Sequence, residues 1–169
     1  MKKLYGSSIT KESYFLKVLC NKHGIKCIPE YYGDGFHGNN QYIKIEYVDS
    51  TLEKYLESTD IAGKFSFEDI SIQLLECLKQ LHLVGFIHQD VKPDNFLISS
   101  IDNKVRVIDL GIMMEYESKG APGRHGFQGT PVFGSIKALE GYSLSRRDDL
   151  ECLGYTIMYL LDPSKIPWS

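Results

Sequence analysis

The chain has 169 residues, a formal net charge of −3 at pH 7, 43% hydrophobic residues and 24% charged residues. This length is typical of one domain or of part of a larger one, and the apolar content excludes intrinsic disorder as the main description. The 19 basic and 22 acidic residues nearly balance, so the composition provides no global basic surface for nucleic acid or for an anionic membrane. We therefore expect no nucleic-acid partner.

No apolar stretch is long enough to cross a bilayer, and residues 1–12 lack the apolar core of a secretory signal. We expect a monomer in the cytoplasm, with the nucleus as a second location and no membrane contact. The cysteines show no C-x-x-C pair, which favours free and mostly buried thiols. They are Cys20, Cys27, Cys77 and Cys152. Four histidines have no obvious partner in the sequence and are expected on the surface or in packing roles. They are His23, His37, His82 and His125.

The first predicted element is a short helix over residues 10–21, with an apolar face and Gly24 just beyond its end. A hairpin is predicted over residues 25–48, because Tyr, Ile and Val residues are interrupted by Gly-Asp-Gly and Gly-Asn-Asn turn signals. Its second strand, residues 41–48, alternates apolar and charged side chains, as a half-buried strand does. The apolar ones are Ile43, Ile45 and Tyr47.

The clearest helix begins at Ser66, where Ser66 and Asp69 have the spacing of a capping box, and it ends at Gly85. Its apolar face consists of Phe67, Ile70, Leu74, Leu78 and Leu81. Two short strands, residues 96–98 and 105–109, flank a polar turn and predict a second hairpin. Residues 111–134 are rich in Gly and Pro and predict a long loop, which in compact domains is usually functional.

The last predicted helix covers residues 148–161, and Ser145 with Asp148 repeats the capping-box spacing. Apolar residues lie around most of its circumference, so we expect it to be covered on several sides. Only residues 162–169 follow it, which predicts that the covering segment is missing from this chain.

A polar run over residues 88–95, between a helix and a strand, concentrates the residue types of phosphoryl transfer. That reaction needs a carboxylate to orient the attacking hydroxyl, a cation near the transferred phosphate, and an Asn and an Asp to hold Mg²⁺. Asp90, Lys92, Asn95 and, after the next strand, Asp109 supply these groups in that order. The alternative is that these residues only form turns. Turns do not require Asp-x-Lys-x-x-Asn followed by Asp-x-Gly.

At these residues the sequence resembles the eukaryotic protein kinases and, within them, the casein kinase 1 family. The specific matches are F-I-H-Q-D-V-K-P-D-N-F-L-I over residues 86–98, V-I-D-L-G over 107–111 and S-R-R-D-D-L-E-C-L-G-Y over 145–155. The resemblance implies an α+β fold of the two-lobed protein kinase type, in truncated form. Residues 1–48 would be the remnant of the small lobe, and residues 49–169 would be part of a mostly helical large lobe.

The resemblance implies a serine/threonine protein kinase that transfers the γ-phosphate of ATP to Ser/Thr hydroxyls of protein substrates. Asp90 would be the catalytic base or orienting carboxylate, and Lys92 would neutralise the transferred phosphate. Asn95 and Asp109 would bind Mg²⁺. Asp149 would anchor the catalytic loop from the last helix.

The same resemblance assigns the nucleotide contacts. Residues 46–48 would form the hinge that hydrogen-bonds adenine through its backbone, with a gatekeeper before it and an apolar floor below the base. Glu12 would be the helix glutamate that pairs with a strand lysine of the ATP site, and Thr130 would lie near Asp90 and Lys92. The implied nucleotide-binding residues are Glu12, Ile45, Glu46, Tyr47, Val48 and Leu97.

The sequence departs from the family pattern upstream, where a Gly-rich loop and a V-A-I-K-like strand are absent. Lys2 or Lys3 could replace the strand lysine, although their spacing to Glu12 is short for the family. Gln89 replaces the Arg of H-R-D, which argues against switching by loop phosphorylation. Leu110 replaces the Phe of D-F-G, a conservative apolar change.

A further departure lies at residues 129–132, where G-T-P-V replaces the family's G-T-A-R and removes an Arg that helps to read a phosphorylated substrate residue. This change argues against a preference for pre-phosphorylated substrates. Arg124 and His125 could meet an acidic substrate, but a solvated loop is the favoured interpretation. Two competing functional hypotheses stay open: a weak or inactive pseudokinase that acts as an interaction module, and a non-functional fragment of a longer kinase.

Overall fold

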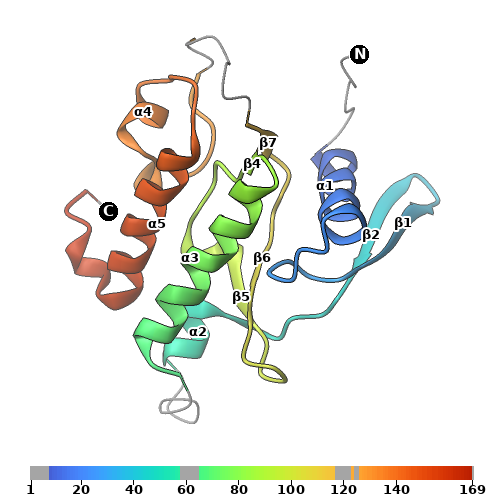
Figure 1. The fold of residues 1–169 in the computed structure, drawn as a ribbon, viewed down its shortest axis with the longest axis horizontal. Coiled ribbons are helices and arrows are strands. Elements are labelled where there is room, and N and C mark those ends of the chain that lie inside the picture. The colour runs from blue at the N-terminus through green and yellow to red at the C-terminus, as the bar shows by residue number, and fades with distance from the viewer. Residues whose placement is uncertain (1–7, 58–64, 117–122, 124–125, 169) are drawn as a thin grey trace.

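The computed structural model describes residues 8–57, 65–116, 123 and 126–168 (Figure 1). Its α-helices are α1 (Ser8–Lys17), α2 (Leu52–Glu57), α3 (Phe67–Leu83), α4 (Ile136–Leu139) and α5 (Arg146–Leu161). Its strands are β1 (Tyr31–His37), β2 (Asn40–Ile45), β3 (Ser50–Thr51), β4 (Phe86–Ile87), β5 (Phe96–Ile98), β6 (Val105–Val107) and β7 (Met114–Glu115). Small antiparallel sheets and several helices confirm the α+β expectation.

The first helix packs on the β1–β2 hairpin and continues into a π-helical turn, Val18–Lys22. Phe15 and Leu19 of this segment are buried, as the predicted apolar face requires. Phe15 also meets Phe86 of β4 edge-on, with 5.6 Å between ring centroids. This aromatic contact joins α1 and the hairpin, on the right of Figure 1, to the remainder of the structure.

The predicted hairpin is confirmed, but its second strand is shorter than predicted. The antiparallel register pairs Tyr31 with Ile45, and beyond that pair the chain has no partner strand. Glu46 still donates its backbone N–H to Glu30, but Tyr47 lies outside the ladder and is 84% exposed. The expected half-buried positions of Tyr47 and of Ile45 are wrong, because Ile45 is also exposed, at 37%, although it pairs with Tyr31. Alternation along a sequence does not by itself show whether another element covers the apolar face of the strand.

Helix α3 is the central element of the fold, and it packs against α5, β4 and β6 (Figure 1). The predicted capping box is present: Ser66 Oγ accepts from the Asp69 backbone N–H at 3.1 Å, and Asp69 Oδ2 accepts from the Ser66 N–H at 3.2 Å. The predicted apolar face also forms the centre of the core. Its fully buried residues are Ile70, Leu74, Leu78 and Leu81.

The substitution Ser66→Ala is expected to lower the free energy of unfolding by about 1 kcal/mol, because it leaves an N-terminal amide of α3 without its acceptor. Urea denaturation followed by circular dichroism measures the change. Ser66→Thr keeps the hydroxyl and serves as the matched control. A Ser66→Ala protein as stable as the wild type would contradict the role of this cap.

The second predicted hairpin is also confirmed, with β5 and β6 antiparallel and β3 added on the other side of β5. Phe96 lies opposite Val107, and Leu97 lies opposite Arg106. The second strand ends at Val107, two residues earlier than predicted. The predicted long loop is more regular than expected. It contains β7, which pairs with β4, and a 3-10 turn over Pro131–Phe133.

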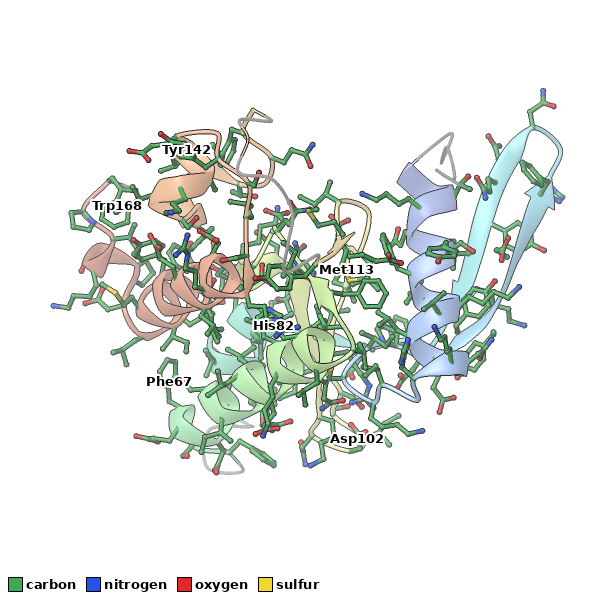
Figure 2. All side chains as sticks on the ribbon, turned by 45° about the horizontal axis from the view of Figure 1, so that its top comes forward. Phe67, His82, Asp102, Met113, Tyr142 and Trp168 are labelled. Carbon is green, nitrogen blue, oxygen red and sulfur yellow. The ribbon has the colours of Figure 1, made fainter. Side chains whose placement is uncertain are left out.

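The last helix, α5, begins at Arg146, two residues before the predicted start. The predicted cap is present, since Asp148 Oδ2 accepts from the Ser145 backbone N–H at 2.7 Å. Much of the apolar surface of α5 is exposed; Leu161, for example, is 66% exposed. A 3-10 turn, Pro163–Lys165, leads to Trp168, whose indole N–H donates to the Val132 carbonyl at 2.9 Å. Figure 2 shows Trp168 at the edge of the molecule, beside α5.

The prediction of free and mostly buried thiols is confirmed. Cys27, Cys77 and Cys152 are buried and Cys20 is half-buried. Burial raises the pKa of the Cys152 thiol to about 12. None of the helices in the described ranges combines the length and the apolar character that crossing a bilayer requires.

Candidate active site

A hydrogen-bonded network joins three of the residues that the sequence singled out. Lys92 Nζ donates to Thr130 Oγ1 at 2.9 Å, and the Thr130 hydroxyl donates to Asp90 Oδ1 at 2.8 Å. Lys92 Nζ also lies 3.3 Å from Asp90 Oδ2. The predicted position of Thr130 near Asp90 and Lys92 is confirmed. The network places a carboxylate, an ammonium and a hydroxyl side by side in a half-buried position.

Asn95 is buried next to this network, in the 3-10 turn Pro93–Asn95. Its side-chain Nδ2 donates to the Asp90 carbonyl at 2.8 Å and to Asp90 Oδ2 at 3.1 Å. Because both bonds use the nitrogen, the orientation of the amide is fixed and its oxygen is left as an acceptor. Such an oxygen is a suitable ligand for a hard cation.

Asp109 lies two residues after the end of β6, the strand that pairs with β5, and β5 follows Asn95 directly. Ile108 donates its backbone N–H to the Asn95 carbonyl at 2.9 Å, which brings the two predicted metal ligands to the same end of the β5–β6 pair. Asp109 adopts φ +56°, an uncommon value for a residue other than glycine, and such strain often occurs at functional sites.

The described residues contain no group of three or more His, Cys, Asp or Glu side chains that could hold a metal. Mg²⁺ does not need such a cage, because it is usually bound by one or two carboxylates together with waters and substrate phosphates. The side-chain amide oxygen of Asn95 and the carboxylate of Asp109 are therefore suitable ligands for Mg²⁺.

Glu12 lies on α1, near the start of the segment that follows β6. Its pKa is raised, first by burial and second by the negative charge of Asp109, whereas the backbone N–H of Leu110 partly lowers it. Two carboxylates thus face the same region, so a cation bound there would stabilise the ionised form of both. Lys2 and Lys3, the predicted candidates for such a cation, lie outside the described residues.

Asp149 fixes the loop that carries Asp90. Its side chain is only 3% exposed and accepts three hydrogen bonds. The donors are the backbone N–H of His88 at 2.8 Å, the backbone N–H of Gln89 at 2.9 Å and His82 Nε2 at 2.8 Å. The predicted anchoring by Asp149 is confirmed. His82, for which the sequence offers no obvious partner, lies on the buried face of α3 and finds its partner, Asp149, on α5.

His88 links the same loop to the end of β6. The Asp90 backbone N–H lies 3.3 Å from His88 Nδ1, so this nitrogen acts as the acceptor. The proton then resides on Nε2, which donates to the Ile108 carbonyl at 3.1 Å. The buried imidazole of His88 therefore connects the backbone of the loop that carries Asp90 with the residue before Asp109.

Gln89 connects the loop with two further segments. Its side-chain amide donates to the Ile112 carbonyl, and its backbone adopts φ +71°. A Cβ at Gly129 would lie only 2.8 Å from the Gln89 carbonyl, and Gly129 itself has φ +102°. Glycine is therefore required at this position, and it allows the chain to approach closely enough for Thr130 to reach Asp90.

The predicted hinge segment follows β2. Ile45 is the last residue of β2, and Glu46 and Val48 are half-buried, unlike the exposed Tyr47. Glu46 forms an ion pair with Arg106 of β6. Leu97, the predicted floor, is half-buried on β5 directly opposite Arg106. The hinge segment therefore adjoins the strand pair that ends at the predicted metal ligands.

Sequence reasoning missed Arg106, which nothing in its local pattern distinguishes from an ordinary exposed strand residue. It also missed His82, although its place four residues after Leu78 puts it on the buried face of α3. Arg124 and His125, named as possible substrate contacts, lie outside the described residues.

The curated proteins that are similar to this chain include two kinases. Casein kinase 1-like protein HD16 of Oryza sativa subsp. japonica is 38% identical over 111 residues, which cover 59% of this chain and 15% of that protein. The probable serine/threonine-protein kinase FPV212 of Fowlpox virus (strain NVSL) is 32% identical over 153 residues, which cover 83% of this chain and 50% of that protein. The chain thus spans half or less of the length of these relatives.

The family comparison covers more of the sequence than either relative. A family model described as the protein kinase domain matches residues 1–169. The chain belongs to the protein kinase family.

Proposed function

We propose that this chain is part of a serine/threonine protein kinase of casein kinase 1 type, which transfers the γ-phosphate of ATP to Ser or Thr hydroxyls of protein substrates. The observation that carries the proposal is the network of Asp90, Lys92 and Thr130. It holds a carboxylate and an ammonium side by side, and phosphoryl transfer to a hydroxyl uses this pair of charges.

In this proposal, Asp90 accepts a hydrogen bond from the substrate hydroxyl and aims its oxygen at the γ-phosphorus. Lys92 lies beside Asp90 and stabilises negative charge on the phosphoryl oxygens in the transition state. Thr130 donates to Asp90 and accepts from Lys92, so it keeps both side chains in place. Mg²⁺ held by Asn95 and Asp109 would neutralise the phosphate charge and orient the phosphate chain.

We assign nucleotide binding to the segment between β2 and β3 and to its neighbours. The Glu46 N–H is already bonded to Glu30, so adenine would use the Glu46 carbonyl and the backbone of the following residues. Glu12 would pair with a cation at the phosphate end. The other proposed contacts are Ile45 as gatekeeper, Tyr47 and Val48 in the hinge, and Leu97 below the base. Residues 1–48 would belong to the small lobe and residues 49–169 to the large lobe.

The proposal is tested first by nucleotide binding. Mg²⁺-ATP at a hundredfold excess over its Kd stabilises a protein that binds it by about 2.7 kcal/mol, which a thermal-shift assay detects. Asp109→Asn is expected to remove the magnesium-dependent part of this shift. Asp162→Asn, which alters a carboxylate of the last 3-10 turn, is the matched control and should keep it.

The second test is transfer of ³²P from ATP to peptides that differ only in Ser, Thr or Tyr at one position. We expect labelling of the Ser and Thr peptides. A magnesium-dependent thermal shift without labelling would favour the pseudokinase hypothesis. A folded protein with no shift at any ATP concentration would contradict the proposed kinase function and would favour a pseudokinase that acts as an interaction module.

A further inference from the structure

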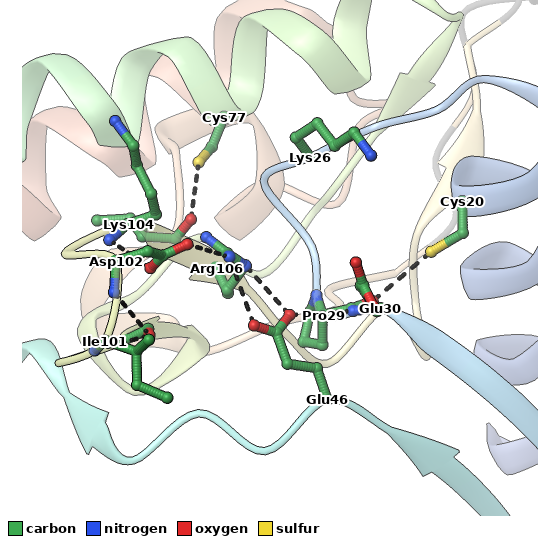
Figure 3. Close-up of polar contacts among 12 residues, drawn as sticks. Cys20, Lys26, Pro29, Glu30, Glu46, Cys77, Ile101, Asp102, Lys104 and Arg106 are labelled. Atoms are coloured by element: carbon green, nitrogen blue, oxygen red, sulfur yellow. Dashed lines mark hydrogen bonds and ion pairs between the residues drawn. The ribbon is translucent and has the colours of Figure 1, made fainter.

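Arg106 of β6 lies between two carboxylates that come from distant parts of the chain (Figure 3). Its Nε is 3.3 Å from Glu46 Oε2 and its Nη2 is 3.4 Å from Glu46 Oε1, so the guanidinium engages both oxygens of Glu46. Nη2 also donates to Asp102 Oδ2 at 2.7 Å. Burial by itself would lower the pKa of Arg106, but the two carboxylates together raise it. The two carboxylates therefore stabilise the charge of a half-buried guanidinium.

Glu46 is fixed by its backbone as well as by its side chain. Its N–H donates to the Glu30 carbonyl at 2.8 Å, and its Oε2 accepts the Glu30 N–H at 3.1 Å. Together with the two bonds from Arg106, these contacts leave Glu46 little freedom. Glu46 is the first residue after β2, so its position sets the course of residues 47 and 48.

The strand that carries Arg106 is itself well fixed. Val107 donates its backbone N–H to the Cys27 carbonyl at 2.7 Å, and Arg106 pairs with Leu97 across the β5–β6 ladder. The same two strands lead to Asn95 and Asp109. An ion pair from Arg106 to Glu46 therefore connects the proposed adenine-binding backbone with the strands that carry the proposed metal ligands.

We propose that Arg106 is a positioning residue of the nucleotide site: through Glu46 it holds residues 46–48 at a fixed distance from the β5–β6 pair. This inference rests on the proposed function, because residues 46–48 bind adenine only in that proposal. In this inference, Arg106 does not contact the nucleotide or the substrate and acts only through Glu46.

An ordinary surface ion pair has little effect, since solvent screens it and two flexible side chains must be ordered. The Arg106 pair differs, because its side chain is only 11% exposed and that of Glu46 is 22% exposed. The planar guanidinium also reaches two carboxylates at once, which a lysine ammonium does not reproduce. We therefore expect Arg106→Lys to restore function only in part.

Both residues line an open groove of about 720 Å³ between α3, the segment before β1 and the β5–β6 turn. Water can therefore reach Glu46 when Arg106 is removed, and the variant should still fold. Asp102 provides the matched control. It binds the same guanidinium but belongs to the turn and touches no residue of the hinge segment in the described contacts.

The experiment compares Arg106→Met, Arg106→Lys and Asp102→Asn with the wild type in the full chain. Hydrogen exchange followed by mass spectrometry reports on residues 46–48, and titration with a fluorescent adenine nucleotide gives Kd. For Arg106→Met we expect faster exchange in the hinge segment and a Kd about tenfold higher, the loss typical of one hydrogen-bonded charge pair. Asp102→Asn should change Kd by less than about threefold.

A charge exchange tests the pair itself. Arg106→Glu places three carboxylates together and should raise hinge exchange further, whereas the double variant Arg106→Glu/Glu46→Arg should lower it again. Where transfer activity is present, Arg106→Met should raise KM for ATP and leave kcat nearly unchanged.

Unchanged exchange at residues 46–48 in Arg106→Met, or equal changes in Asp102→Asn, would overturn the positioning role. A wild-type protein that binds no nucleotide would instead contradict the proposed function. The exchange measurement decides on the Arg106 contact in either case.

Discussion

Replacing Asp90 with Ala is expected to reduce the turnover of phosphotransfer by roughly two to four orders of magnitude, the usual contribution of a positioned general base. The substitution removes the acceptor that would orient the substrate hydroxyl. It also leaves Thr130 and Asn95 without a shared partner. Initial-rate measurements with a Ser peptide at saturating Mg²⁺-ATP give the change in kcat.

Asp94→Ala is the matched control for this prediction, because Asp94 lies in the same loop but is exposed. It should retain turnover within a few-fold of the wild type. The Asp90→Ala protein should also bind Mg²⁺-ATP nearly as well as the wild type, which separates a lost chemical step from a lost nucleotide site. Wild-type turnover in Asp90→Ala would rule out the role that we assign to this carboxylate.

Replacing Asp149 with Ala is expected to lower the free energy of unfolding by about 3–5 kcal/mol, the cost typical of breaking a buried, hydrogen-bonded charge network. Two backbone N–H groups, of His88 and Gln89, lose their acceptor, and so does His82. His82 and His88 are buried, so their donors have little access to water as a substitute acceptor. Urea denaturation followed by circular dichroism measures the effect.

Arg147→Ala, an exposed change two positions earlier on α5, is the control and should alter stability by less than about 0.5 kcal/mol. His82→Ala removes only one of the three donors and should be less damaging than Asp149→Ala. A loss below about 1 kcal/mol for Asp149→Ala would mean that the three hydrogen bonds do not hold the loop.

The sequence predicts the elements whose signals are local. The capping box at Ser66 and the apolar face of α3 are properties of neighbouring residues, and both are present as predicted. The exposure of Tyr47 could not be predicted, because it depends on where the partner strand β1 begins. The contact between His82 and Asp149 joins residues 67 positions apart, and no local pattern encodes it.

The candidate site also combines features that the sequence predicts with features that it does not. Asp90, Lys92, Asn95 and Thr130 are recognisable from the order of residue types, and the structure brings them together. The bond between the Gln89 side chain and Ile112 was not predictable from the sequence, and neither were the contacts of Arg106. They depend on how separate segments pack, which is a property of the whole fold.

The attachment of the loop to α5 has a consequence for how the candidate site responds to heating. The backbone N–H groups of residues 88 and 89 donate to the buried carboxylate of Asp149, in the first turn of α5. The loop therefore has little freedom to move away while α5 stays packed. Loop and core then form one cooperative unit. The loop should therefore lose its structure at the same temperature as the rest of the fold. We expect no stable intermediate in which the loop is disordered while α5 stays packed.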